Sequence, residues 1–473
     1  MDIAYAGPNV PEPAKLAPLP RNLFARIGAR IYRRLSPPPT LITFWKAGGI
    51  MFLVILTFII GNFCIKPDKA VHRNMLGHDF LAFYYGGTCA LTGHTERLYD
   101  LGETKKFEAT TGKNAGLELG TSFGPWWNPP FAAWMFAPLA ALPYVKALLL
   151  WWSIGALCLV ISIVLLIRML RGNWEAKALV PLLMLTTMPF IQATNHGQNT
   201  FVSLLLLTTV VTLWRARQSF LAGLVCGLLF YKPQLGMIVA IVLCITQGRR
   251  AILGVTLVGT SLLLINVLTM PGSLREFFYH MPVNLHWELE QNHYMWGRHI
   301  TFKGFWRLIF QDHAEGPTAP IVLVLWGICE AALAGALLAA IAYTLTQPRS
   351  AARTDRLIAA TIVSMPLLMP FYFDYDLLLI SVGAVLYGVD LQRSAGDYPR
   401  QVPWEDRWLP RAWLILYIAL EFAAVLAGHT RIALAPPLVA WIAVLLIRRV
   451  LRPLKTGDIH AAVRGASPMP IAA

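Results

Sequence analysis

The 473-residue chain is 56% hydrophobic and only 14% charged, with a mean hydropathy of +0.55. A soluble core of this length would need a far more polar shell, so the composition excludes an ordinary soluble protein. The net charge of +15 falls mainly in short basic clusters between apolar runs. Such clusters favour contact with anionic lipid headgroups and give no support for nucleic acid as a partner.

The chain begins with a segment that differs from the apolar runs behind it. Residues 1–20 are rich in Pro and Ala and are predicted to be disordered. Residues 21–35 place Leu23, Ile27 and Ile31 at helical spacing between arginines, as expected of an interfacial helix. We expect residues 1–45 and 451–473 to be cytoplasmic tails on either side of a transmembrane domain, 46–450.

The charges of the loops predict the orientation of that domain. Loop 66–128 contains seven Lys/Arg and seven Asp/Glu, and loop 271–319 contains four and five. Cytoplasmic loops carry an excess of Lys and Arg, so these two balanced loops are predicted to be extracytoplasmic. The predicted cytoplasmic clusters are Arg21–Arg34, Arg168–Lys177, Arg215–Arg217, Arg249–Arg250, Arg349–Arg356, Arg393–Arg411 and Arg448–Lys455.

The same rule limits the number of spans. Residues 129–170 are apolar enough for two spans, but only a single span at 146–170 keeps Arg168–Lys177 inside. The proline-broken segment before it is therefore predicted to form short helices on the outer interface. The result is an all-α polytopic membrane protein of about twelve transmembrane helices, near 46–65, 146–170, 178–193, 199–214, 218–231, 234–247, 251–270, 320–346, 356–371, 375–390, 410–427 and 431–449.

Ionisable residues gather in the outer turns of this map, whereas the cytoplasmic turns hold only Arg and Lys anchors. Ionisable groups at membrane depth are costly unless they pair or serve a function. The outer rim is therefore the expected place for a site. Its residues are Asp79, at the start of loop 66–128, with His196, Gln198, Lys232, Asp374, Asp376, His429 and Arg431 in short turns.

Four segments resemble, in order, glycosyltransferase family 87, a family of integral-membrane enzymes of the GT-C class. They are "HDFLAFYYGG" at 78–87, "WNPPFAAWMFAPLAALP" at 127–143, "GQNTFVSLLLL" at 197–207 and "YKPQLGMIVAIVL" at 231–243. The resemblance extends over roughly residues 40–450 and is loose at 271–318. It implies a GT-C fold and an inverting transfer of a sugar, mannose by analogy, from a polyprenyl-phosphate donor.

The resemblance also implies roles for particular residues. Asp79 matches the family's general base, and a carboxylate is suited to take the proton of an attacking hydroxyl. The leaving phosphate is already anionic and needs cations, for which the candidates are Lys232, Arg298, His299 and Arg431. Candidate contacts to the sugar or the acceptor, a glycolipid or glycan, are His78, Tyr84, Tyr85, Asn128, His196, Gln198, Asp374 and Asp376. No cofactor and no metal site are expected, and the predicted location is the plasma (inner) membrane with the site outside.

Several alternatives stay open. Asp79 is also a favoured N-cap residue, and Tyr84 and Tyr85 are typical interfacial anchors. Glu330 and Glu421 lie inside predicted spans without an assigned partner. The rival functions are a lipid or polysaccharide transporter or flippase, and a polysaccharide ligase or polymerase with a lipid-diphosphate donor.

Overall fold

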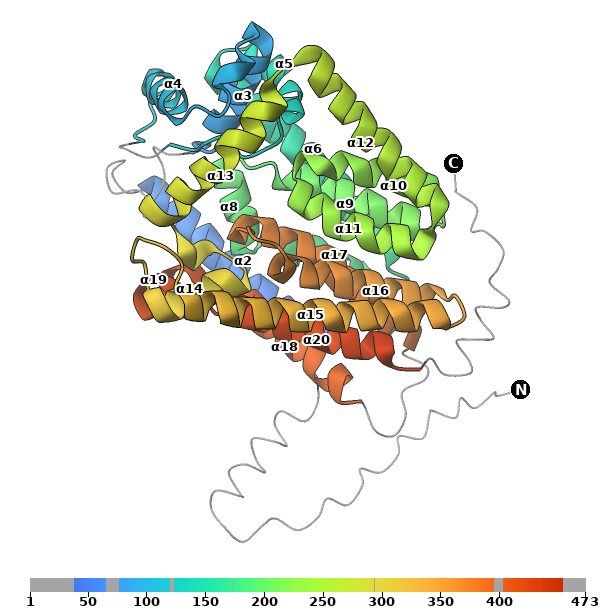
Figure 1. Ribbon diagram of the computed structural model, residues 1–473. Coiled ribbons are helices and arrows are strands. Elements are labelled where there is room, and N and C mark those ends of the chain that lie inside the picture. Colours follow the sequence, from blue (N-terminus) through green and yellow to red (C-terminus); the bar gives the residue numbers. More distant parts are fainter. Residues whose placement is uncertain are drawn as a thin grey trace, which may run out of the picture.

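The computed structural model describes residues 38–64, 76–119, 123–172, 174–292, 294–394 and 403–453. The predicted interfacial helix at 21–35 and most of both predicted tails lie outside these ranges. Every regular element within them is helical (Figure 1), and an isolated backbone bridge joins His299 to Phe373. The predicted all-α class is confirmed.

Four helices in the described ranges are long and apolar enough to cross a membrane. They have 21 to 27 residues, and about 20 residues span a hydrocarbon core of about 30 Å. They support the prediction of a polytopic membrane protein. These helices are α2 (Leu41–Cys64), α6 (Tyr144–Met169), α12 (Arg249–Thr269) and α15 (Pro320–Thr346).

Two further candidate spans are broken. One bends by 51° between α7 (Trp174–Leu185) and α8 (Met188–His196), and the other bends by 73° between α18 (Trp404–Leu420) and α19 (Ala423–Thr430). Counting each bent pair as one span gives six spans among the described residues. Twelve spans remain a prediction, because the other helices are too short to count by length alone.

The shorter helices occupy the remaining predicted spans. The hairpin predicted at 218–247 forms α10, η5 and α11, with Lys232 buried at its turn. Near Asp374 the helical segments are short 3-10 turns rather than the ends of long spans. The bounds are α9 (Thr200–Arg215), α10 (Ser219–Leu228), η5 (Leu229–Tyr231), α11 (Pro233–Gln247), α16 (Ala351–Ser364), η7 (Met365–Leu368), η8 (Asp374–Ile380), α17 (Ser381–Ser394) and α20 (Ala435–Leu451).

The two bends lie against each other and share hydrogen bonds. The hydroxyls of Thr186 and Tyr417 are 2.6 Å apart. The backbone N–H of Met188, at the start of α8, donates to Glu421 Oε1 at 3.0 Å. The first N–H groups of a helix lack partners within it, so Glu421 satisfies a donor that the bend exposes. This contact supplies the partner that the sequence did not reveal for Glu421.

The two loops predicted to be extracytoplasmic fold as short helices, seen at the upper left of Figure 1 for α3 and α4. An aromatic core joins the first of these loops to α6, with Phe83 stacked on Phe136 and both rings packed against Trp151. The elements of the loops are α3 (Phe80–Thr92), η3 (Thr95–Arg97), α4 (Leu101–Asn114), α13 (Ser273–Gln291), η6 (Trp296–Arg298) and α14 (Phe302–Gln311). Between the first loop and α6 lie η4 (Pro130–Met135) and α5 (Ala137–Ala140).

Candidate functional site

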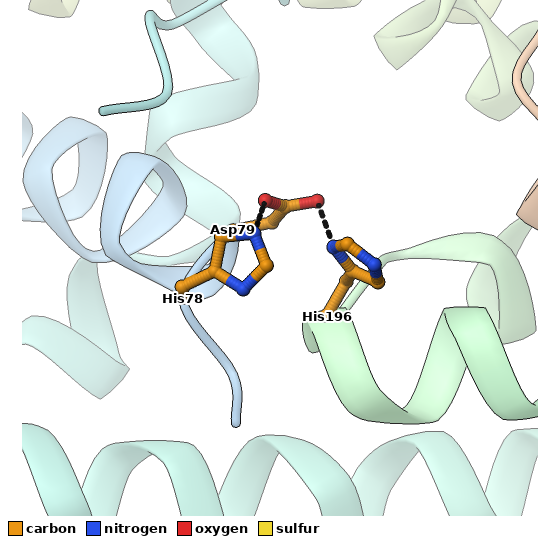
Figure 2. A group of neighbouring side chains, drawn as sticks. All are labelled: His78, Asp79 and His196. Carbon is orange, nitrogen blue, oxygen red and sulfur yellow. Dashed lines mark hydrogen bonds and ion pairs between the residues drawn. The ribbon is translucent and has the colours of Figure 1, made fainter. Parts of the chain in front are cut away.

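The carboxylate of Asp79 lies between two histidine rings (Figure 2). Its Oδ1 is 2.9 Å from His78 Nε2, and its Oδ2 is 3.1 Å from His196 Nδ1. The amide nitrogen of Gln198 donates to Oδ2 at 2.6 Å. Asp79 does stand at the N-cap position of α3, but its side chain accepts no capping hydrogen bond from that helix. The capping alternative is therefore wrong.

Two glycines allow the start of α3 to approach the end of α8. Gly77 and Gly197 both have positive φ, +76° and +70°, a conformation that glycine adopts without steric cost. The N–H of Gly77 donates to the carbonyl of Asn195 at 2.6 Å. A Cβ on Gly77 would lie 2.6 Å from a methyl carbon of Leu148. Backbone contact between the two turns thus places Asp79 beside His196.

Asp79 is ionised in this setting. Burial alone would raise the pKa of the Asp79 carboxyl, but hydrogen bonds and positive charge from His196 and His78 hold it well below its ordinary value. Just over a quarter of the side chain, 27%, is still exposed. An ionised carboxylate that solvent or substrate can reach is suited to accept a proton.

Two further carboxylates lie on η8, each with its own cation. Asp374 receives two hydrogen bonds of 2.9 Å from Arg298. Asp376 receives Lys232 Nζ at 2.9 and 3.1 Å and the hydroxyl of Thr200 at 2.7 Å. Burial would lower the pKa of the Arg298 guanidinium, and the charge of Asp374 outweighs that effect and raises it.

Gln192 connects the residues around Asp79 to the first of these pairs. Its Oε1 lies 2.8 Å from His196 Nε2 and 3.5 Å from an Arg298 guanidinium nitrogen. The sequence did not single out Gln192. A signal was present, because residues four apart share a helix face, and Gln192 and His196 have this spacing in the segment 188–196.

Glu108 is a second residue that the sequence did not indicate. It is buried on α4 and accepts a hydrogen bond from the N–H of Gly124 at 2.9 Å. Burial raises the pKa of the Glu108 carboxyl from 4.5 to about 8, and the negative charge of Asp79 adds to the shift. Glu108 therefore holds a proton at neutral pH while Asp79 does not.

Two residues predicted to bind the phosphate have surroundings that do not suit that role. His299 is completely buried, its ring lies among those of Tyr294, Trp296 and Phe373, and burial lowers its pKa to about 3. It is a neutral ring rather than a cation. Arg431 is 63% exposed and pairs with Asp312 at 2.9 Å, so its charge is solvated and already partnered.

Three residues predicted to contact sugar or acceptor make hydrogen bonds within loop 66–128 or to the segment that follows it. Tyr84 OH donates to the carbonyl of Leu142 at 2.9 Å, and Tyr85 OH donates to that of Arg97 at 2.8 Å. The backbone carbonyl of Asn128 accepts from a tyrosine hydroxyl at 2.8 Å, and its side chain is buried. These contacts favour a structural role for all three.

His78, Asp79 and His196 also offer three ligand atoms within 4.8 Å of one another, a grouping of the kind that can hold a metal ion. In the structure both ring nitrogens that face the carboxylate lie at hydrogen-bond distance from it. We therefore describe these residues, with Gln198, as the Asp79 cluster, a hydrogen-bonded group. The absence of a metal site stays a prediction.

The site can be compared with known proteins. Residues 126–370, just over half of the chain, match the profile of glycosyltransferase family 87. The matched segment contains His196, Lys232 and Arg298 and begins after Asp79. No curated protein and no solved structure matches the chain. From the extent of this match, the protein belongs to glycosyltransferase family 87, a family of membrane glycosyltransferases.

Proposed function

We propose that the protein transfers a hexose, mannose by family analogy, from a polyprenyl-phosphate donor to a hydroxyl of a glycolipid or glycan on the extracytoplasmic face of the plasma (inner) membrane. The observation that carries the proposal is the ionised Asp79 carboxylate, which is partly exposed and is linked through His196 and Gln192 to the cation Arg298. A second cation, Lys232, at the turn between η5 and α11, pairs with Asp376 on η8. A base and cations are the two requirements of this transfer.

In the proposed reaction Asp79 takes the proton of the acceptor hydroxyl. The hydroxyl oxygen forms a bond to the anomeric carbon, and the bond from that carbon to the phosphate oxygen breaks. Its electron pair leaves on the phosphate, which gains one negative charge, and attack from the face opposite the phosphate inverts the anomeric configuration. The leaving group needs no acid, because its charge is stabilised by cations.

Lys232 and Arg298 are our candidates to bind that phosphate. Both side chains are largely buried, with 10% and 14% of their surface exposed, and both are held in place by carboxylates. A guanidinium has five N–H donors and an ammonium has three, so each retains donors beyond those used for Asp374 and Asp376. Charge stabilisation is stronger in such a water-poor place than at the surface.

An apolar cavity next to η8 suits the lipid chain of the donor. It has a volume of about 340 Å³ and lies where the two broken spans meet, with Met184, Pro189, Leu377, Tyr417 and Leu420 in its wall. Both α8 and η8 run from this cavity to the Asp79 cluster and pack against each other. A lipid whose phosphate binds at Lys232 and Arg298 has a hydrocarbon-lined space within reach.

Broken helices are also a feature of transporters, and a flippase is the alternative that this observation favours. A flippase would move the lipid-linked sugar across the membrane without changing its covalent bonds. The assay must therefore detect a new glycosidic bond rather than movement of the lipid.

The test is sugar transfer by the purified protein from synthetic polyprenyl-phosphate mannose to lipids extracted from the host membrane. We expect Asp79→Asn to fold with a somewhat lower melting temperature, because the ionised carboxylate stabilises the folded state, and to lose about 10²–10⁴-fold in rate, as for loss of a general base. Asp100→Asn is the matched control, because Asp100 caps α4 in the same loop and Asn caps equally well. Normal transfer by the Asp79 variant would refute the base assignment.

A further inference from the structure

The exposed surface of α12 stays largely apolar up to the end of this helix. Val267 and Leu268 are both exposed in the last turn, Leu268 with 71% of its surface. Such a surface, on a helix long enough to span a bilayer, faces hydrocarbon. The chain then turns at residues 270–272, where Gly272 has a positive φ of +82°, and α13 continues in a new direction (Figure 1).

One face of α13 is fixed to the protein. The side-chain amide of Asn266, in the last turn of α12, donates to the hydroxyl of Ser273 at 3.0 Å. Asn284 donates to the backbone carbonyl of Tyr99 at 2.8 Å, and the Phe277 ring lies 5.6 Å from the Tyr99 ring. Ser273, Phe277 and Asn284 follow one another at helical spacing, which places them on one face of the helix. These contacts determine which side of α13 faces away from the protein.

The opposite face of α13 carries an exposed apolar patch. Phe278 and Tyr279 each have 71% of their surface exposed, and Pro282 and Val283, one turn further along, are exposed as well. We call these four residues the α13 patch. Large exposed apolar patches mark sites of contact with another molecule or with a membrane, so this face of α13 needs an occupant.

We propose that the α13 patch inserts into the lipid headgroup region of the leaflet at which α12 ends, the outer leaflet in the predicted orientation. The patch continues the lipid-facing surface of α12 beyond the turn. Trp and Tyr are the residues typical of this depth, and Trp134, which is also partly exposed, donates to Thr269 at the end of α12 at 2.8 Å. Tyr279 and Trp134 thus mark the same end of this span.

Two features place the α13 patch at the interface rather than in the hydrocarbon core. Pro282 has no N–H and cannot donate to the carbonyl of Phe278, four residues before it. A carbonyl without that partner is costly in hydrocarbon but can bind water at headgroup depth. Arg275 and His286 are exposed on the same face, one on each side of the patch along the helix, and Arg275 can contact anionic lipid headgroups.

The fixed face of α13 connects this membrane contact to the candidate site. Through Tyr99 the helix holds loop 66–128, which contains Asp79. A helix that rests on the lipid surface therefore also sets the height of that loop above the bilayer. The membrane contact itself does not depend on the proposed sugar transfer, so its test needs no substrate.

The experiment uses the purified protein in vesicles of phosphatidylcholine and phosphatidylglycerol that contain a photoactivatable phospholipid. One probe lipid carries its diazirine next to the glycerol, and the other carries it at the end of an acyl chain. After illumination, mass spectrometry locates the labelled residues. We expect the first probe to label the α13 patch and the second to label the middle of α12 but not the patch. Helix α4 is the internal control, because it is polar and lies in the other outer loop, and it should stay unlabelled.

Three results would overturn the proposal. Labelling of the patch no stronger than that of α4 would mean that water or protein covers it instead of lipid. Equal labelling of the patch by both probes would place α13 in the hydrocarbon core. A ratio of patch labelling to α12 labelling that falls as the protein-to-lipid ratio rises would identify a second copy of the chain as the occupant.

Discussion

Two groups of carboxylates in the described part of the chain have partners that differ in kind. Away from the Asp79 cluster, Asp355 pairs with Arg215 and Arg393, and Asp390 pairs with Arg356 and Arg449. These residues come from the ends of α9, α16, α17 and α20. Asp79, by contrast, has two histidines and a glutamine amide.

This difference indicates that the ion pairs of Asp355 and Asp390 have a structural role, whereas the Asp79 cluster is suited to proton transfer. Arginine does not lose its proton in proteins, so the charges around Asp355 and Asp390 are permanent and no proton is exchanged there. Histidine is the side chain that titrates near neutral pH, so the surroundings of Asp79 change their charge when protons move. A carboxylate that must take up and release a proton needs partners of the second kind.

The largest expected effect tests the structural group. Asp390 is 2% exposed and lies between two arginines. Asp390→Asn should lower the free energy of unfolding by about 3–5 kcal/mol, because removing one partner leaves buried charge uncompensated. Thermal unfolding in detergent measures it. A folded, stable protein with lost sugar transfer is the result expected of Asp79→Asn, so the same result for Asp390→Asn would remove the contrast between the two places.

The next largest effect concerns Lys232. Its ion pair with Asp376 resembles the structural pairs of Asp355 and Asp390. If Lys232 also binds the donor phosphate, Lys232→Ala should weaken donor binding by about tenfold to a hundredfold, the range of one charge-assisted contact. Lys232→Arg keeps the charge and should retain part of the affinity. The measurement is the concentration dependence of transfer on the donor.

Lys303 provides a control for that experiment, because it is also a partly buried lysine and lies over Trp296 and Trp326 instead of a carboxylate. Lys303→Ala should leave donor affinity unchanged. Equal affinity in both alanine variants and the wild type would assign Lys232 to the structural group with the arginines.

The sequence predicted the fold class and many residues of the candidate site, but it did not predict which of these residues pair with each other. Hydropathy alone predicted the long helices, and the resemblance to the family pointed to Asp79. Charge in short outer turns predicted His196, Gln198 and Lys232, because polar residues near a membrane need a partner or a function. In the structure these residues lie in the candidate site, and their roles stay predictions.

The sequence could not predict which side chains form ion pairs or hydrogen bonds, because these depend on tertiary contacts between segments far apart in the chain. Nothing in the sequence joins Arg298 to Asp374 or Glu421 to Met188, and the breaks in the two bent spans bring the latter pair together. His299 was predicted to bind the phosphate because it follows an arginine. Nothing in the sequence indicates the four aromatic rings that surround its side chain.

A smaller effect concerns Glu108, the carboxyl near Asp79 that stays protonated. Its pKa is raised to about 8 in the folded protein against 4.5 ordinarily, so the folded state binds the proton more tightly. Its contribution to stability is full below pH 4.5 and is lost as the pH rises through about 8. The melting temperature of the wild type should therefore decline over that window more than that of Glu108→Gln, which stays neutral. Parallel declines would contradict the raised pKa.

The smallest expected effect is that of a chelator, and it tests whether the Asp79 cluster exchanges protons or binds metal. The two ring nitrogens that face the carboxylate are hydrogen-bonded to it, and the proposed cations for the phosphate are Lys232 and Arg298. Both requirements of the transfer are thus met by side chains of this chain, and the transfer rate should be unchanged after dialysis against EDTA. A loss of rate that Mg²⁺ or Mn²⁺ restores would contradict the expectation. Because a metal would bind through the same two histidines and Asp79, that outcome would replace the proton-accepting role of this carboxylate with a metal-binding one.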